Sequence, residues 1–196
     1  YAILVINGAD GVQGHTMTLW KLLKRYQVPV FIFVNKMDQP GTDKEKTLAE
    51  LQKKLDVNCI DYNGQGKDCL YDTAAMCSET LMEEYLNTGK ISDEAMNEAI
   101  GHRQIFPCLF GSALKMEGVK ELLAFMDAHM QRREYPEEFG ARVFKIVRDE
   151  QDNRLTYMKI TGGSLKVKAM LTDYHEGMEP SECWQEKADQ IRLYSG

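Results

Sequence analysis

Asp38 is the side chain in this sequence whose setting points most directly to chemistry. It closes the tetrapeptide Asn35-Lys36-Met37-Asp38. A carboxylate can accept two parallel hydrogen bonds, and the Watson–Crick edge of guanine presents two adjacent N–H donors. Adenine presents no such pair and would leave the carboxylate unpaired, which gives strong discrimination between the two bases. Lys36 has an aliphatic stem long enough to lie over a purine ring, and the Asn35 amide can tie neighbouring loops together.

The tetrapeptide follows a segment with the pattern of a buried strand. Residues 30–34 are Val-Phe-Ile-Phe-Val, and Pro29 precedes them. Such a β-branched and aromatic run is typical of strands that are buried on both faces in parallel sheets. Ligands of these sheets bind beyond the carboxyl ends of the strands, where Asp38 would lie. An ordinary strand-to-helix turn is the alternative interpretation, because Asn and Asp are common in turns.

A second strand-like segment, residues 105–110, leads into the loop Gly111-Ser112-Ala113-Leu114. Gly111 allows the backbone to come close to a ligand. We predict that the backbone N–H groups of Ser112 and Ala113 donate to a purine carbonyl oxygen. We also predict that both loops lie at the same edge of one sheet. Together they favour a base-binding site over an ordinary turn.

The overall composition is that of an ordinary globular chain with one domain or two small ones. Its 196 residues are 43% hydrophobic and 28% charged, and the formal net charge is −6. This charge gives no support for bulk electrostatic binding of nucleic acid, so we expect no direct sequence-specific nucleic-acid contact. No apolar run approaches the roughly 18 to 20 residues of a membrane span. The chain opens on a strand-like segment, so we expect neither a membrane segment nor a signal peptide.

Cysteine and histidine usage argues against a metal site or a disulfide framework. The five cysteines are odd in number and include no C-x-x-C pair, which fits a reducing cytosol. His102, His129 and His175 lie far apart in the sequence without ligand spacing. We therefore expect a cytoplasmic protein with no metal ligands in this chain.

The first two thirds of the chain alternate strands and helices. Residues 1–6 are apolar and predict a strand. The helix predicted next has an apolar face made of Met17, Leu19, Trp20, Leu22 and Leu23. With the strand at residues 30–34 this forms a βαβ unit. Further helices are predicted near residues 48–55, near 81–86, after the N-cap Ser92, and over 119–130. The stretch from about residue 56 to 104 exceeds what a crossover needs, so we interpret it as an inserted subdomain.

The last third of the chain has an all-β pattern. Residues 131–138 are charged, contain Pro136 and lack periodicity, which predicts a linker. Strands are then predicted at residues 142–147, 155–160, 165–171 and 190–194. We therefore expect two domains, residues 1–135 and 136–196, the second forming part of a barrel. Trp184 either caps that barrel or lies in a loop.

In their order and spacing these motifs resemble the guanine-recognition half of GTP-binding proteins. Over most of its length the chain resembles translational GTPases of the elongation factor G class. Asn35-Lys36-Met37-Asp38 matches the fourth guanine-nucleotide motif, and Gly111-Ser112-Ala113 the fifth. Residues 1–14 resemble the segment after the second switch region, and residues 143–165 resemble the opening strands of domain II. The chain is most similar to ribosomal-protection tetracycline-resistance proteins, a preference that rests on Gln39, where elongation factor G usually carries arginine.

The resemblance implies an α/β fold, a partial P-loop-GTPase-type parallel sheet with flanking helices, followed by part of an all-β barrel domain. It implies that the guanine part of GTP or GDP is bound by Asn35, Lys36, Asp38, Ser112, Ala113 and Leu114. For the whole protein it implies a GTPase that binds the ribosome and, if of the resistance type, dislodges tetracycline.

Parts of the family pattern are missing from this sequence. It contains no G-x-x-x-x-G-K-S/T phosphate loop, no switch threonine segment and no D-x-x-G-H of the second switch. Mg²⁺ is expected only in the full-length protein, because its usual hydroxyl ligand comes from the missing loop. We therefore interpret the chain as an internal fragment that recognises guanine, has no catalytic residue of its own and does not hydrolyse GTP.

Two alternatives remain open. The parent protein is either a resistance protein, or elongation factor G or a release-factor-like GTPase. The chain itself is either guanine-binding or a GTPase-derived interaction module that binds partners and no nucleotide. A phosphate loop encoded upstream of Tyr1 would favour the guanine-binding GTPase over the interaction module.

The first strand also predicts self-association. In the fold that this chain resembles, the strand at residues 2–6 is interior, and its neighbour precedes the phosphate loop. Here it becomes an edge strand that is apolar on both faces and has no Lys, Pro or bulge to block pairing. We therefore predict a dimer or larger assembly that forms through residues 1–6. The alternative is a monomer whose edge is covered by its own linker or partial barrel.

Overall fold

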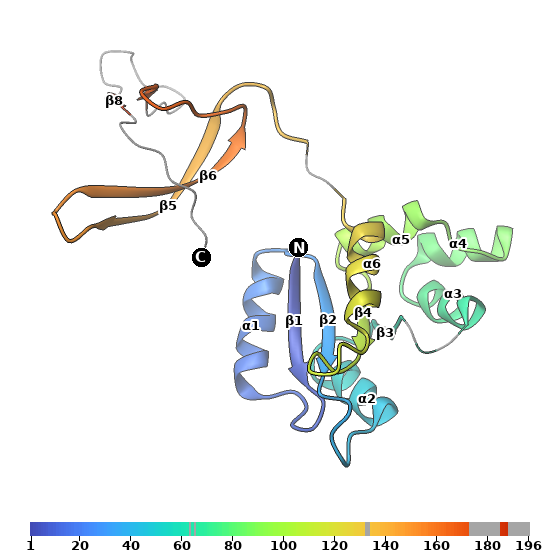
Figure 1. Ribbon diagram of the computed structural model, residues 1–196. Coiled ribbons are helices and arrows are strands. Elements are labelled where there is room, and N and C mark those ends of the chain that lie inside the picture. Colours follow the sequence, from blue (N-terminus) through green and yellow to red (C-terminus); the bar gives the residue numbers. More distant parts are fainter. Residues whose placement is uncertain (63, 65, 132–133, 173–184, 188–196) are drawn as a thin grey trace. The chain divides into compact units, whose positions relative to one another are not determined.

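The computed structural model of this chain describes residues 1–62, 64, 66–131, 134–172 and 185–187. It divides into two compact units, residues 1–131 and residues 132–196. The first unit is a parallel sheet with helices on both faces, and the second contains antiparallel strands (Figure 1). The predicted combination of an α/β part with a β part is therefore confirmed.

The sheet of the first unit has four parallel strands in the order β1-β2-β4-β3. These are β1 (Ala2–Asn7), β2 (Val30–Asn35), β4 (Phe106–Phe110) and β3 (Cys59–Asp61). Val34 pairs with Ile6 on one side and with Phe110 on the other. Since all the strands run the same way, the loops that leave β1, β2 and β4 come together at one edge.

Two layers of helices cover the sheet. The cluster on one face joins Leu4, Ile32 and Val34 of the strands to Trp20 of α1 (Gly14–Arg25) and Leu51 of α2 (Lys44–Lys54). The opposite face packs under α6 (Val119–His129) and under three helices inserted between β3 and β4. The inserted helices are α3 (Lys67–Ala75), α4 (Glu79–Thr88) and α5 (Asp93–Gly101).

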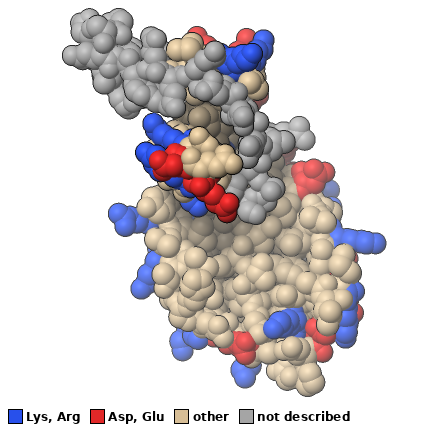
Figure 2. Space-filling model, turned by 60° about the vertical axis from the view of Figure 1, so that its left-hand side comes forward, with Lys and Arg blue, Asp and Glu red and all other residues tan. Residues whose placement is uncertain are grey.

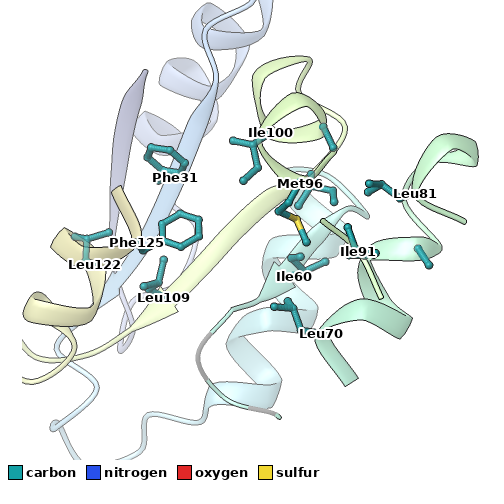
Figure 3. Packing of buried hydrophobic residues seen from close by; sticks show 14 of the residues in the cluster. Phe31, Ile60, Leu70, Leu81, Ile91, Met96, Ile100, Leu109, Leu122 and Phe125 are labelled. Atoms are coloured by element: carbon teal, nitrogen blue, oxygen red, sulfur yellow. The ribbon is translucent and has the colours of Figure 1, made fainter. Parts of the chain in front are cut away.

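Strand β2 lies between β1 and β4 in the sheet, and every residue of its apolar run is buried. Phe31 and Phe33 point to the α6 face, and Val30, Ile32 and Val34 point to the opposite face. Figure 3 shows Phe125 of α6 beside Phe31 and Leu109. The ring centroids of Phe31 and Phe125 are 5.2 Å apart in an edge-to-face arrangement. The prediction of a strand buried on both faces is confirmed.

Helix boundaries follow the sequence signals in several places. The Ser92 hydroxyl accepts a hydrogen bond from the Ala95 N–H, as expected of an N-cap, and Gly89 ends α4 with a left-handed φ of 70°. Other expectations were wrong. Leu19 and Leu22 do not widen the buried face of α1, because both are exposed. The stretch between residues 56 and 104 is not wholly an insertion, because it begins with strand β3 of the main sheet.

Strand β1 is uncovered on one face. Among the described residues it pairs only with β2. Leu4 and Ile6 are buried, but Ile3 is 42% exposed and Val5 is 58% exposed. Figure 2 brings the α1 and β1 side of this unit forward and shows a broad face with few charged side chains. The predicted edge strand is therefore observed within the described part of the chain.

The second unit contains two antiparallel strand pairs. Strand β5 (Gly140–Arg148) pairs with β6 (Arg154–Gly162), and β7 (Met170–Thr172) pairs with β8 (Gln185–Lys187). The strands predicted at residues 142–147 and 155–160 are confirmed. Residues 165–169 are not in a strand, because a turn precedes Met170. The strand predicted at residues 190–194 and the position of Trp184 lie outside the described residues.

No helix in the described part of the chain is both long and apolar enough to cross a membrane.

Candidate nucleotide-base site

The loops after β1, β2 and β4 are joined by backbone hydrogen bonds at the carboxyl edge of the sheet. The Met37 N–H donates to the Gly111 carbonyl at 3.0 Å, and the Gly111 N–H donates to the Val34 carbonyl at 2.9 Å. The Gly8 N–H donates to the Asn35 carbonyl at 2.8 Å. Both predicted site loops therefore lie at the same edge of one sheet, as the sequence indicated.

Asn35 ties the two predicted site loops together through its side chain. Its Oδ1 accepts a hydrogen bond from the Ala113 N–H at 2.8 Å and another from the Lys36 N–H at 2.8 Å. Lys36 adopts a left-handed φ of 65°, which turns the chain sharply after β2. The role predicted for the Asn35 amide is confirmed by these contacts.

The carboxylate of Asp38 lies beside the second loop. The Ser112 hydroxyl donates to it, and the Lys115 Nζ is 3.6 Å from its Oδ2. The hydrogen bond from Ser112 and the nearby charge of Lys115 hold the pKa of Asp38 below its ordinary value. Asp38 is therefore an ionised acceptor at neutral pH, oriented by the loop that the sequence placed next to it.

The loop from Gly111 to Gly118 is closed by the backbone alone. The Ser112 N–H donates to the Glu117 carbonyl, and the Glu117 N–H donates back to the Ser112 carbonyl, each at 3.0 Å. The two ends of the loop come into contact at Gly111 and Gly118. A Cβ on Gly111 would collide with the Glu117 carbonyl, and a Cβ on Gly118 would lie 2.6 Å from the Phe110 carbonyl. Only glycine allows this approach.

The backbone N–H groups of Ser112 and Ala113 have acceptors inside the protein, and their predicted donation to a base stays a prediction. The Ser112 N–H is bonded to Glu117, and the Ala113 N–H is bonded to Asn35. In the described part of the chain, the Leu114 N–H is a donor of this loop without an acceptor inside the protein. The hydrogen bonds of Ser112 and Ala113 hold the loop in shape, and Leu114 is exposed.

The loop that follows β1 is held in place by helix α2. The Glu50 carboxylate of α2 accepts a hydrogen bond from the Val12 N–H at 3.2 Å and one from Lys54 Nζ at 2.6 Å. The hydrogen bond from Lys54 is the main reason that the pKa of Glu50 lies below its ordinary value. Gly11 has a left-handed φ of 66° and lies against this carboxylate. Sequence reasoning did not single out Glu50, although its position on the polar side of a short helix was visible.

Taken together, the described residues offer a set of hydrogen-bonding groups that a planar base could use. Asp38 offers a carboxylate with two acceptor oxygens, the Leu114 N–H offers a donor, and Lys36 is exposed beside them. A planar base with two adjacent N–H groups and a nearby carbonyl oxygen matches this pattern. Lys115, which approaches Asp38 directly, was not identified from the sequence.

Residues 1–132 match the family of the elongation factor Tu GTP binding domain. The chain belongs to this family. Because the match spans both loops at the carboxyl edge of the sheet, the Asn35–Asp38 segment and the Gly111–Leu114 segment lie within the GTP-binding domain of the family.

Several proteins named as translation factors are similar to this chain. Ribosome-releasing factor 2 of Drosophila ananassae mitochondria is 26% identical over 97% of this chain and 34% of its own length. Elongation factor G of Ureaplasma urealyticum is 26% identical over 84% of this chain and 34% of its own. The tetracycline resistance protein TetO of Streptococcus mutans is 27% identical over 87% of this chain and 29% of its own. The resemblance to the elongation factor G class is confirmed.

The fold has a counterpart among solved structures. A crystal structure of a protein from Thermus thermophilus superposes with a TM-score of 0.66 at 19% identity. The match covers 87% of this chain and 33% of that protein. This chain therefore spans about a third of the length of the relatives that it matches.

Proposed function

We propose that this chain supplies the guanine-recognising part of a translational GTPase of the elongation factor G class. The observation that carries the proposal is the Asp38 carboxylate, held ionised beside Ser112 at the edge where two tied loops meet. Guanine would place its N1–H and amino group on this carboxylate and its carbonyl oxygen toward the Leu114 N–H. Asn35 would maintain the loops, and the Lys36 stem would cover one face of the base.

The partner and subfamily belong to the same proposal. The names of the relatives associate them with ribosome release, elongation and tetracycline resistance. We favour a ribosome-associated factor of the elongation factor G or ribosome-releasing type, because the match to ribosome-releasing factor 2 covers 97% of this chain and the match to the resistance protein covers 87%. Protection of the ribosome against tetracycline is the second candidate, supported by the match to TetO. Expression of the full-length gene in a susceptible host, followed by growth in tetracycline, separates the two.

The domain assignment and the chemistry of this chain complete the proposal. The antiparallel strands β5 to β8 would be the opening part of a domain II barrel. In the absence of a phosphate-loop motif from the sequence, we expect no GTP hydrolysis above background by this chain, since phosphoryl transfer depends on positioning the phosphates and Mg²⁺. Steady phosphate release that Asp38→Asn abolishes would contradict that expectation.

Base exchange tests the guanine site. The full chain is titrated with guanosine, adenosine and xanthosine, and binding is followed by NMR at the Ala113 and Leu114 amides. We expect weak binding that favours guanosine. Asp38→Asn should reverse the preference toward xanthosine, because xanthine carries a carbonyl where guanine carries the amino group and an amide can donate to it. Equal binding of adenosine, or no binding of any nucleoside, would support the interaction-module alternative.

A further inference from the structure

Lys115 is the charged group closest to Asp38 in the described structure. Its Nζ lies 3.6 Å from the Asp38 Oδ2. A guanine amino group would have to donate its hydrogen bond to a carboxylate oxygen of this residue. The Lys115 side chain is 53% exposed, and that of Asp38 is 17% exposed. The ammonium group therefore approaches the carboxylate from the solvent side, from which a base must also arrive.

The position of Lys115 is set by the closed loop. Its backbone N–H donates to the Ser112 carbonyl at 3.2 Å and lies 3.4 Å from the Ser112 hydroxyl oxygen. Ser112 is also the residue whose hydroxyl donates to Asp38. One serine thus holds both the carboxylate and the backbone of the lysine that pairs with it. The next N–H, that of Met116, donates to the Ala113 carbonyl, so the turn carrying Lys115 is fixed on both sides.

We propose that Lys115 is an internal counterion of Asp38 that a guanine base displaces on binding, and that it therefore lowers guanosine affinity while leaving adenosine affinity unchanged. The inference rests on the proposed guanine site. An ammonium group on Oδ2 lowers the ability of that oxygen to accept another hydrogen bond. Guanine replaces it with two parallel donors, one on each oxygen. Adenine has no donor pair for a carboxylate, so it leaves the ion pair in place and gains nothing from Asp38.

The charge on Lys115 makes this competition dependent on salt. An ion pair with one exposed partner is weakened as ionic strength rises, since the Debye length falls from about 30 Å at about 0.01 M to about 3 Å at about 1 M. Guanosine is uncharged, so its own hydrogen bonds to Asp38 are screened much less. Salt should therefore strengthen guanosine binding to the native chain, which is the opposite of the effect expected if Lys115 attracted a ligand.

The test uses the full chain, the Lys115→Met variant and a Lys120→Met control. Lys120 is an exposed lysine in the first turn of α6, five residues after Lys115, and it has no ion pair among the described residues. Guanosine and adenosine are titrated at low and high salt. We expect Lys115→Met to bind guanosine about two- to fivefold more tightly than the native chain at low salt, the range of an exposed ion pair. The gain should vanish at high salt, and the control should match the native chain.

The outcomes separate this inference from the proposed function. If the native chain binds guanosine selectively but Lys115→Met binds it equally or more weakly at low salt, Lys115 is no competitor and the inference fails alone. If neither the native chain nor Lys115→Met binds guanosine, the guanine site and the inference both fail. Adenosine binding that tightens in Lys115→Met as much as guanosine binding would also overturn the inference, because Lys115 would then not act through the hydrogen bonds of guanine to Asp38.

Discussion

The two ends of the parallel sheet differ in how they are covered. At the β3 and β4 end, the inserted helices and α6 bury Ile60, Leu109 and Phe125 in one cluster (Figure 3). At the β1 end, Ile3 and Val5 point to the same side of the sheet and remain exposed. Both ends are built from apolar strands. Coverage by a neighbouring element therefore decides burial here, and residue type alone does not.

The largest expected effect contrasts two residues of α6. Phe125 is 4% exposed and Leu123 is 59% exposed. We expect Phe125→Ala to lower the free energy of unfolding by about 3–5 kcal/mol, because it leaves a cavity between Phe31 and Tyr62. Leu123→Ala should change it by about 0.5 kcal/mol or less. Urea denaturation measures both, and similar losses would show that burial does not decide what an apolar side chain of α6 contributes.

A smaller effect is expected from the ion pair between Lys44 of α2 and Asp61 at the end of β3. The two charged atoms are 2.7 Å apart, the Asp61 side chain is 10% exposed, and its Oδ1 has no hydrogen-bond partner among the described residues. Lys44→Met should cost about 1–3 kcal/mol, because it leaves a mostly buried carboxylate unpaired while Lys44 itself is partly solvated.

The matched control for this pair is Lys54→Met. Lys54 pairs with Glu50 at 2.6 Å on a more exposed part of α2. Lys54→Met should lower the free energy of unfolding by about 0–1 kcal/mol, as is usual for exposed ion pairs. A larger loss from Lys54→Met than from Lys44→Met would reverse the ranking.

His129 should give the covered end a pH dependence. Its Nδ1–H donates to the Asn97 Oδ1, and its Nε2 accepts from the Tyr62 hydroxyl, each at 2.6 Å. Burial lowers the pKa of His129 below its ordinary value of 6.5, and the charge of Asp93 opposes this only partly. Burial also raises the pKa of Tyr62 to about 12, so its hydroxyl keeps its proton.

Because the folded pKa of His129 is lowered, the unfolded chain binds more protons below pH 6.5. Stability from neutral His129 is thus fully present above 6.5 and is lost as the pH falls toward the folded pKa. The free energy of unfolding, measured by urea denaturation across this window, should fall more steeply for the native chain than for His129→Gln. His102→Gln, at an exposed histidine that follows α5, is the control substitution. Equal slopes for the native chain and both variants would show that His129 does not cause the pH dependence of stability.

The smallest effect on stability is expected at the open end, at Val5. Self-association through residues 1–6 stays a prediction, and the exposed edge and face of β1 motivate it. Val5→Lys should leave unfolding almost unchanged but lower the concentration-dependent mass measured by light scattering, since a charge disfavours pairing of apolar edges. A native chain that stays monomeric at high concentration would argue against association.

The elements that sequence reasoning predicted best are long or strongly patterned. Strands β2 and β4 are continuous apolar runs, and α6 has a helical period, so local sequence was sufficient. Strand β3 has only three residues and precedes a glycine-rich loop, and its place in the sheet depends on pairing with β4. The exposure of Leu19 and Leu22 also depends on what lies opposite α1, which no local pattern contains.

The candidate site shows the same division. The contact of Asn35 with the second loop followed from residue type and spacing, and the base-binding role of Asp38 stays a prediction. The internal hydrogen bonds of the Ser112 and Ala113 N–H groups to Glu117 and Asn35 could not be predicted from the local sequence. The two glycines at the ends of the loop were a signal for this crossing. Lys115 had no signal, since a single lysine after a loop becomes meaningful only once the loop is closed.

The closed loop also sets which substitutions the site can tolerate. Its shape depends on main-chain bonds between Ser112 and Glu117, so the exposed side chains of Leu114 and Met116 are free to vary without loss of the fold. Met116 has a left-handed φ of 60°, and glycine or asparagine should be accepted there at least as well. Gly111 and Gly118 have no such freedom. In a saturation library, the two intolerant glycines would enclose permissive positions at Leu114 and Met116, through which base preference can change while the scaffold stays constant.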